Sequence, residues 1–337
     1  MNKLGSIQRA AGSAQDSEGI LSLPDPFILY HGGELRGARL AWRLTGEAGL
    51  PVVAALGGIS AHRRVFDVDQ ERRGWWHEVV GPGRALDSRR CRVLGIDFLG
   101  GSGESTRPEA GVEPPSLSSY DQAEALRRLL DHLALPRIGT IVGASYGGMV
   151  ALAFGERYPG QVGRLIVISA ADRTHPLSTA WRTVQRRTVR FALAQGAGAQ
   201  GLELARALAM ATYRSGEEFA ARFSEPPQRI DGRFEFPVEH YLFARGREYA
   251  QRVQPESFLC LSESIDLHRV DAARIDVPTS AVAVREDQLV PIEDMRALAA
   301  RLPNGRLHEI SSPHGHDAFL KEAGQLRPIL ACAYGEC

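Results

Sequence analysis

The chain has 337 residues, of which 44% are apolar and 24% are charged. This balance is typical of a globular protein with a sizeable core, and it excludes wholesale disorder. Forty lysines and arginines balance forty aspartates and glutamates. We therefore expect neither nucleic acid nor an anionic membrane as a partner.

The amino-terminal residues and the cysteines indicate a cytoplasmic protein. Residues 1–19 hold no apolar run of the kind that a signal peptide needs. The longest apolar stretch, from Ile138 to Gly155, is interrupted by Ser145 and five glycines, which argues against a membrane span. The four cysteines show no metal-ligand spacing, so we expect free thiols and no metal site.

Short β-rich runs alternate with helical patterns along most of the chain. Residues 1–22 are polar and small, and we expect them to form a flexible tail. The segments Phe27–Tyr30 and Ala38–Thr45 flank a His-Gly-Gly turn, which predicts a hairpin. Later strands are expected over Val52–Leu56, Arg92–Phe98, Gly139–Ala144, Leu165–Ser169, Thr279–Val284 and Arg306–Ile310, and helices over Ser119–Leu133 and Gly148–Tyr158. Continuous apolar strands separated by helices indicate an α/β protein, with a mostly parallel sheet covered on both faces.

Residues 172–276 differ from the rest of the chain in composition and pattern. They are rich in arginine and helical by pattern, and no run typical of a sheet core occurs before Thr279. We interpret this segment as a helical lid inserted over the active end of the sheet. Residues 23–171 and 277–337 then form the α/β core.

The most informative stretch runs from Ile141 to Met149 and holds a Gly-x-Ser-x-Gly motif centred on Ser145. An apolar strand leads into the motif and a helical pattern leaves it, which is the setting of a nucleophilic serine on a sharp turn. The turn brings Gly143 and Gly147 close together, so both positions must be small. The following helix directs backbone N–H groups and a positive dipole toward a developing oxyanion. Ser145 is therefore our candidate nucleophile.

A serine hydroxyl needs a base, and the base needs an acid that orients it. In this architecture the acid follows a late strand and the histidine comes after the acid. Asp287 is the best candidate for the acid, with its neighbour Glu286 as the competitor. His314 and His316 both follow the last expected strand, and position alone does not separate them. We favour His316 because it stands just before a helical run.

A second oxyanion donor is expected in the loop after an early strand. The sequence Leu56-Gly57-Gly58 fits this role, because glycines let the backbone approach a substrate closely. We expect the donor to be the N–H of Leu56 or Gly57, paired with the N–H of Tyr146. A plain turn between a strand and a helix is the alternative.

Together these residues resemble the homoserine O-acyltransferase family, whose members have the α/β-hydrolase fold. The resemblance extends from about residue 24 to residue 330. Generic esterases rarely combine its Thr-Tyr-Arg-Ser and His-Asp-Ala-Phe-Leu motifs. The parts that carry the resemblance are Leu94–Pro108 (LGIDFLGGSGESTRP), Ser145–Met149 (SYGGM), Ala211–Ser215 (ATYRS), Val238–Leu242 (VEHYL), Ser257–Asp266 (SFLCLSESID) and Gly315–Leu320 (GHDAFL).

The resemblance implies roles for three residues and a reaction. His316 matches the catalytic histidine, and Arg214 and Asp317 match substrate-binding residues. A guanidinium suits the α-carboxylate of L-homoserine, and a carboxylate suits its ammonium. The implied reaction is ping-pong through an acyl-serine, with acyl-CoA as co-substrate, no bound cofactor, and a lid that excludes water. The resemblance also implies a homodimer that works in methionine biosynthesis.

The residues around the oxyanion loop bear on the identity of the acyl group. Succinyl carries an extra carboxylate, and Arg63 and Arg64 could contact it, although a solvated face is the alternative. Leu289 occupies a position where succinyl-using relatives often carry an arginine, and so it points toward acetyl. We slightly favour succinyl. For the whole chain, a serine O-acyltransferase and a generic serine esterase or hydrolase are the alternatives.

Overall fold

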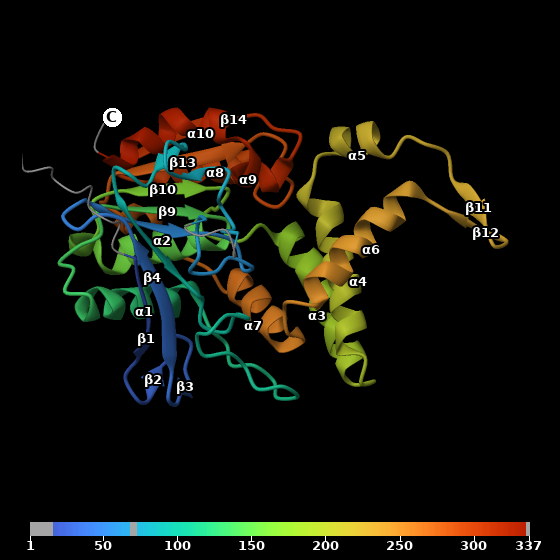
Figure 1. Cartoon of the computed structure of the whole chain (residues 1–337), viewed down its shortest axis with the longest axis horizontal. Helices are drawn as coiled ribbons and strands as arrows, with labels where there is room; N and C mark the ends of the chain where they lie inside the picture. Colours follow the sequence, from blue (N-terminus) through green and yellow to red (C-terminus); the bar gives the residue numbers. More distant parts are fainter. Residues whose placement is uncertain (1–15, 68–72, 335–337) are drawn as a thin grey trace, which may run out of the picture.

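An eight-stranded sheet forms the centre of the protein (Figure 1). The structure is a computed structural model that describes residues 16–67 and 73–334. From one edge of the sheet to the other, the strands are β1 (Asp16–Ser22), β4 (Arg39–Thr45), β8 (Arg92–Ile96), β5 (Val52–Leu56), β9 (Thr140–Ala144), β10 (Leu165–Ile168), β13 (Thr279–Val284) and β14 (Gly305–Ile310). Neighbouring strands run parallel from β8 to β14, whereas β4 is antiparallel to both β1 and β8.

Alternate side chains of the parallel strands enter two separate cores. In β5, for example, Ala54 and Leu56 belong to one hydrophobic cluster, and Val53 and Ala55 belong to the other. Because successive strand residues point to opposite faces, a continuous apolar run is buried only if both faces are covered. The first core includes side chains of α1 (Ser119–His132), α2 (Tyr146–Arg157) and α8 (Ile292–Arg301), and the second includes side chains of α9 (Ala318–Lys321) and α10 (Ala323–Leu330). The α/β-hydrolase fold is thus confirmed.

Residues 172–276 form helices beside the core, and we call them the helical segment. In Figure 1, α3, α4 and α6 stand to one side of the sheet, and a two-stranded arm projects beyond them. The elements of this segment are α3 (Pro176–Leu193), α4 (Gly198–Tyr213), α5 (Gly216–Arg222), β11 (Gln228–Ile230), β12 (Arg233–Glu235), α6 (Pro237–Ala250), α7 (Pro255–Asp266) and the 3-10 turn η2 (Ala272–Arg274). Within the described ranges, the helices are all too short or too polar to cross a membrane.

Short elements complete the core. The strand pairs β2–β3 and β6–β7 form two small sheets of their own. These elements are β2 (Phe27–Ile28), β3 (Glu34–Leu35), β6 (Val80–Gly81) and β7 (Leu86–Asp87), together with the 3-10 turns η1 (Pro159–Gln161), η3 (Gly315–Asp317) and η4 (Ala331–Tyr334).

Three expectations about the core are corrected. The tail expected over residues 1–22 is wrong for residues 16–22, which form β1, while residues 1–15 lie outside the described residues. The hairpin after residue 27 closes on Glu34–Leu35 and not on residues 38–45, because β4 is paired with β1 and β8 instead. Cys91 and Cys260 are free, as expected, but Cys332 is disulfide-bonded.

The turn after β9 generates a prediction about stability. A Cβ atom on Gly143 would lie 2.2 Å from the carbonyl oxygen of Gly147, so Gly143→Ala must push backbone apart. We expect a loss of about 2 kcal/mol or more in the free energy of unfolding, measured by chemical denaturation. Gly160→Ala is the control, because nothing lies within 4 Å of its Cβ position. Equal stability of the two variants would contradict the steric account.

Candidate active site

Ser145 occupies a sharp turn between β9 and α2. Its φ angle is 54°, a left-handed conformation that L residues rarely adopt. The turn is tight on both sides, since a Cβ on Gly143 would meet the carbonyl of Gly147, and a Cβ on Gly147 would lie 2.2 Å from the carbonyl oxygen of Leu56. The two glycines of the motif are therefore required by backbone packing, and they hold Ser145 at the carboxyl end of the sheet.

The structure brings Ser145, His316 and Asp287 into one hydrogen-bonded chain. The Oγ atom of Ser145 lies 2.8 Å from Nε2 of His316, and Nδ1 of His316 lies 2.7 Å from Oδ2 of Asp287. The other carboxylate oxygen of Asp287 accepts backbone N–H bonds from Leu289 and Val290, at 2.8 and 3.0 Å. These bonds fix the carboxylate, which in turn fixes the imidazole ring.

The competing residues make other contacts. Glu286 accepts hydrogen bonds from the hydroxyl of Ser311 and the backbone N–H of Ser312. The Nδ1 atom of His314 lies 2.7 Å from Nη1 of Arg214. Only His316 of the two histidines contacts Ser145 among the described residues.

Burial and charge act in opposite directions on His316. Its removal from water is the largest effect and by itself lowers the pKa, since burial disfavours the charged ring. The charge and hydrogen bond of Asp287 outweigh this effect, and Asp317 adds to them, so that the pKa of His316 is raised above its usual 6.5. Asp287 therefore favours the imidazolium form that His316 would take after accepting a proton.

A second serine–histidine pair lies away from this site. The hydroxyl of Ser119 is 2.7 Å from Nδ1 of His268, but the other ring nitrogen meets the carbonyl oxygen of Ala171 at 3.2 Å, where a triad would have a carboxylate. Burial lowers the pKa of His268 to about 4. Ser119 is fully buried and does not line the cavities that contain Ser145. We interpret this pair as structural.

The loop after β5 lies against Ser145, as the sequence predicts. The carbonyl of Gly57 accepts a hydrogen bond of 2.8 Å from the N–H of Gly147, and a Cβ on Gly58 would lie 4.0 Å from the Ser145 hydroxyl. The N–H of Tyr146 is the first of α2 and has no acceptor within the helix. The residues expected to form the oxyanion hole, Leu56 or Gly57 with Tyr146, are thus assembled around Ser145.

Arg214 and Asp317, expected to bind substrate, lie next to each other. An Nη2 atom of Arg214 is 3.2 Å from Oδ2 of Asp317, and the guanidinium is also 3.4 Å from Glu218. The Nε atom of Arg214 is buried without a hydrogen-bond partner among the described residues. The pair can therefore accept a zwitterion, because an ammonium and a carboxylate can replace one salt bridge with two.

Ser145 and His316 line two adjoining cavities, which we call the inner cavity. The helical segment contributes much of its wall, including Gln185 of α3, Arg206 of α4 and Phe258 of α7. The ring of Tyr213, at the end of α4, meets the His316 ring edge-on, with 5.6 Å between centroids. The residues 172–276 therefore complete the site that the core begins.

Arg206 was not predicted from the sequence. Its guanidinium lies over the rings of Tyr213 and Tyr249, 5.0 and 4.7 Å from their centroids, and it lines both parts of the inner cavity. Burial works against its charge, but the two tyrosines and Asp317 raise its pKa. The available signal was an arginine within an otherwise apolar run of α4, LARALAMA, which is unusual on a buried helix face.

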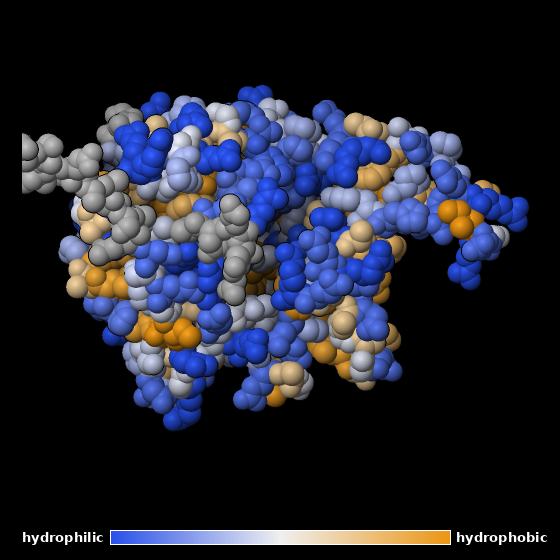
Figure 2. Space-filling model, in the orientation of Figure 1, coloured by the Kyte–Doolittle hydropathy of each residue, from blue (hydrophilic) through white to orange (hydrophobic). Residues whose placement is uncertain are grey.

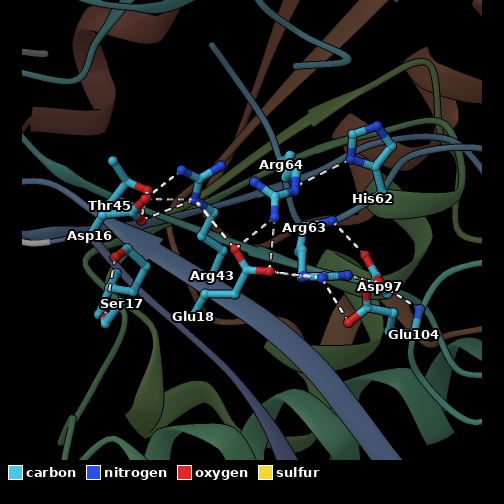
Figure 3. Close-up of polar contacts among 11 residues, drawn as sticks. Asp16, Ser17, Glu18, Arg43, Thr45, His62, Arg63, Arg64, Asp97 and Glu104 are labelled. Atoms are coloured by element: carbon cyan, nitrogen blue, oxygen red, sulfur yellow. Dashed lines mark hydrogen bonds and ion pairs between the residues drawn. The ribbon is translucent and has the colours of Figure 1, made fainter. Parts of the chain in front are cut away.

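Arg63 and Arg64, the possible contacts of the acyl group, are both paired with carboxylates (Figure 3). Arg63 is buried and lies within 2.6–2.9 Å of Asp97, Glu18 and Glu104. Arg64 is 3.1 Å from Glu18. Breaking a buried ion pair leaves an uncompensated charge, so Arg63 is not free to bind a further carboxylate. The reason is β1, which brings Glu18 to this loop.

The contact between His316 and Asp287 predicts a measurable change of pKa. In the unaltered protein the pKa of His316 should lie above 6.5, so the neutral base is lost as the pH falls through that raised value. Asp287→Asn should lower this pKa by about one unit or more, because the opposing charge is removed while burial remains. NMR titration of the ring protons measures it. Glu286→Gln is the control, and an equal effect of both substitutions would contradict the assignment of Asp287.

Comparisons with known proteins agree with the fold and the motifs. The alpha/beta hydrolase fold family matches residues 58–323. The chain is 43% identical to a homoserine O-succinyltransferase of Xanthomonas campestris pv. campestris, over 96% of this chain and 85% of the relative. It is 33% identical to a serine O-succinyltransferase of Litchfieldella anticariensis, over 94% of this chain and 98% of the relative.

Solved structures give the same fold. The homoserine O-acetyltransferase of Staphylococcus aureus superimposes with a TM-score of 0.80 at 24% identity, over 94% of each chain. This likeness concerns the fold alone, whereas the identity to the relatives extends over nearly the whole chain. The chain belongs to the homoserine O-acyltransferase family of the α/β-hydrolase fold.

Proposed function

We propose that the protein transfers an acyl group from acyl-CoA to the hydroxyl of L-homoserine, in the cytoplasm, as a step of methionine biosynthesis. The observation that carries this proposal is the chain of hydrogen bonds from Ser145 through His316 to Asp287, at the floor of a cavity that residues 172–276 cover. The relatives named homoserine O-succinyltransferase and serine O-succinyltransferase support O-acyl transfer.

The first half of the proposed reaction forms an acyl-serine. His316 takes the proton of the Ser145 hydroxyl, and the oxygen attacks the thioester carbon. The oxyanion is stabilised by the N–H of Tyr146 and by that of Leu56 or Gly57. The carbon–sulfur bond breaks, and the thiol of CoA leaves with the proton from His316.

The second half transfers the acyl group to the acceptor. His316 removes the proton from the homoserine hydroxyl, which attacks the acyl-serine, and then returns the proton to Ser145. Arg214 binds the α-carboxylate of homoserine and Asp317 binds its ammonium. The helical segment acts as a lid that keeps water from the acyl-serine, since water would turn transfer into hydrolysis. The reaction needs no bound cofactor.

Succinyl remains the acyl group that we favour over acetyl. Arg63 no longer supports this preference, because three carboxylates already surround it. Arg206 supports it instead, since its charge faces the cavity of Ser145 and favours an acyl group that carries a carboxylate. The 43% identity to a homoserine O-succinyltransferase points the same way.

We also propose that the protein is a homodimer paired through the helical segment. Large apolar side chains are exposed on the outer face of α3 and on the β11–β12 arm, including Val184, Phe191 and Phe234. Phe191 is 71% exposed and Phe234 is 62% exposed. A second copy would cover these side chains, as exposed apolar patches of this kind mark protein interfaces.

The alternative acceptor is L-serine. The support for it is a relative, 33% identical to this chain, that is named serine O-succinyltransferase. Serine carries the same carboxylate and ammonium as homoserine on a side chain shorter by one methylene. Arg214 and Asp317 would therefore bind either amino acid. A serine esterase, the remaining alternative, would release CoA without any acceptor.

The release of CoA can be measured with succinyl-CoA or acetyl-CoA and with L-homoserine, L-serine or no acceptor. We expect release to depend on L-homoserine and to be faster with succinyl-CoA. Ser145→Ala should reduce the rate by about 1,000-fold or more, because the nucleophile is lost. Ser119→Ala is the control and should retain activity. CoA release at the same rate with and without an amino acid would contradict acyl transfer and indicate an esterase.

A second substitution tests the binding of the acceptor. Arg214→Gln removes the charge proposed to meet the α-carboxylate, and we expect the KM for L-homoserine to rise by about tenfold or more. The KM for the acyl donor should change much less. Initial rates at varied concentrations of each substrate separate the two. A KM for L-homoserine within twofold of the unaltered value would remove Arg214 from the acceptor site.

A further inference from the structure

A second cavity adjoins the inner cavity. It has a volume of about 510 Å³ and lies among α4, α5, α6 and the start of α9, and we call it the outer cavity. Arg206 and Asp317 line both cavities. These two residues therefore mark the place where the two cavities adjoin. Figure 2 shows hydrophilic residues bordering the hollow between the core and the helical segment.

The wall of the outer cavity has more cations than carboxylates to balance them. Glu218 is shared by Arg214 and Arg222, at 3.4 and 3.0 Å. Glu248 is likewise shared by two arginines, Arg245 at 2.8 Å and Arg252 at 3.2 Å. The first set is balanced, because Asp317 also pairs with Arg214 at 3.2 Å. The second set retains a net positive charge, because one carboxylate cannot neutralise two guanidinium groups. The excess attracts an anion with several charges.

An aromatic ring lies beside these cations. Tyr241 lines the outer cavity, and the guanidinium of Arg222 stands 4.6 Å from its centroid. Phe223 also packs against this ring, with 5.3 Å between centroids. A flat, partly exposed ring next to arginines is suited to stack on a nucleobase whose phosphates the arginines bind.

We propose that the outer cavity binds the phosphate-bearing nucleotide end of the acyl-CoA donor, with the adenine near Tyr241 and the phosphates on Arg222 and Arg245. This inference rests on the proposed function. CoA carries its thioester at one end of a long arm and its nucleotide at the other. The two adjoining cavities have the same order, because the inner cavity holds Ser145 and the outer cavity holds Arg222 and Arg245.

A neighbouring cavity of about 540 Å³ is the rival site. It also borders the inner cavity, through Ile59, and it contains Arg64 and Arg107. Arg64, however, is paired with Glu18, and part of this cavity is formed by Arg73, which adjoins residues outside the described ranges. The outer cavity lies wholly among described residues, and its Tyr241 ring is partly exposed. The aromatic side chains that line the rival cavity are all buried, namely Phe98, Tyr249 and Phe258.

The test compares two donors that differ in phosphates. Succinyl-CoA has the nucleotide, whereas the succinyl thioester of N-acetylcysteamine has the same reacting group and no phosphate. In the double variant Arg222→Gln/Arg245→Gln, Glu218 keeps its contact with Arg214 and Glu248 keeps its contact with Arg252. Both replaced side chains are about half exposed. Its fold should therefore be kept, which circular dichroism checks. Arg107→Gln, in the rival cavity, is the matched control.

We expect the double variant to raise the KM for succinyl-CoA by about tenfold or more, since two charge-assisted contacts are lost. The KM for the N-acetylcysteamine thioester should stay within about twofold, and Arg107→Gln should leave both values unchanged. An unchanged KM for succinyl-CoA, equal changes for both donors, or the same rise in Arg107→Gln would each overturn the inference while the acyl transfer stands. No transfer from either donor by the unaltered protein would instead overturn the proposed function.

Discussion

The close approach of backbone around Ser145 is the constraint on which the site depends. Gly143 and Gly147 meet at a separation that leaves no space for a side chain, and Gly147 packs in the same way on the carbonyl of Leu56. The N–H of Gly147 then binds the carbonyl of Gly57. One steric fact thus sets the conformation of Ser145, the start of α2 and the position of the loop after β5.

The parallel sheet explains how residues far apart in sequence reach Ser145. His316 follows β14 and Asp287 follows β13, and both strands end at the same edge as β9 because they run in the same direction. Side chains separated by 171 residues along the chain are therefore within hydrogen-bond distance. The core positions the reacting groups through strand direction, which is a property of the whole sheet.

The parts that the sequence predicts are those governed by local rules. Two examples are the apolar runs of β5, β9 and β13 and the glycines around Ser145. Each depends only on residues that are adjacent in the sequence, so each can be recognised from its own segment. The choice between His314 and His316 came from a motif, because their positions alone did not decide it. The structure separates them by what each ring contacts.

The expectations that were wrong depend on pairings across the chain. The strand β1 was predicted to be part of a tail because its residues are mostly polar and small. Its place is set by β4 and by the charges of Asp16 and Glu18. The same strand brings Glu18 to Arg63, so a single missed pairing made Arg63 look available. Arg206 was missed for a related reason, since only the fold shows that its helix faces Ser145.

The residues proposed for the chemistry and most of those proposed for the choice of substrate lie in different parts of the chain. Ser145, Asp287 and His316 belong to the core. Arg206, Tyr213 and Arg214 belong to the helical segment. The ring of Tyr213 meets that of His316, Arg206 lines the same cavity, and Arg214 pairs with Asp317. In the proposed function, acceptance of an amino acid in place of water would depend on these residues together with Asp317 of the core, which pairs with Arg214.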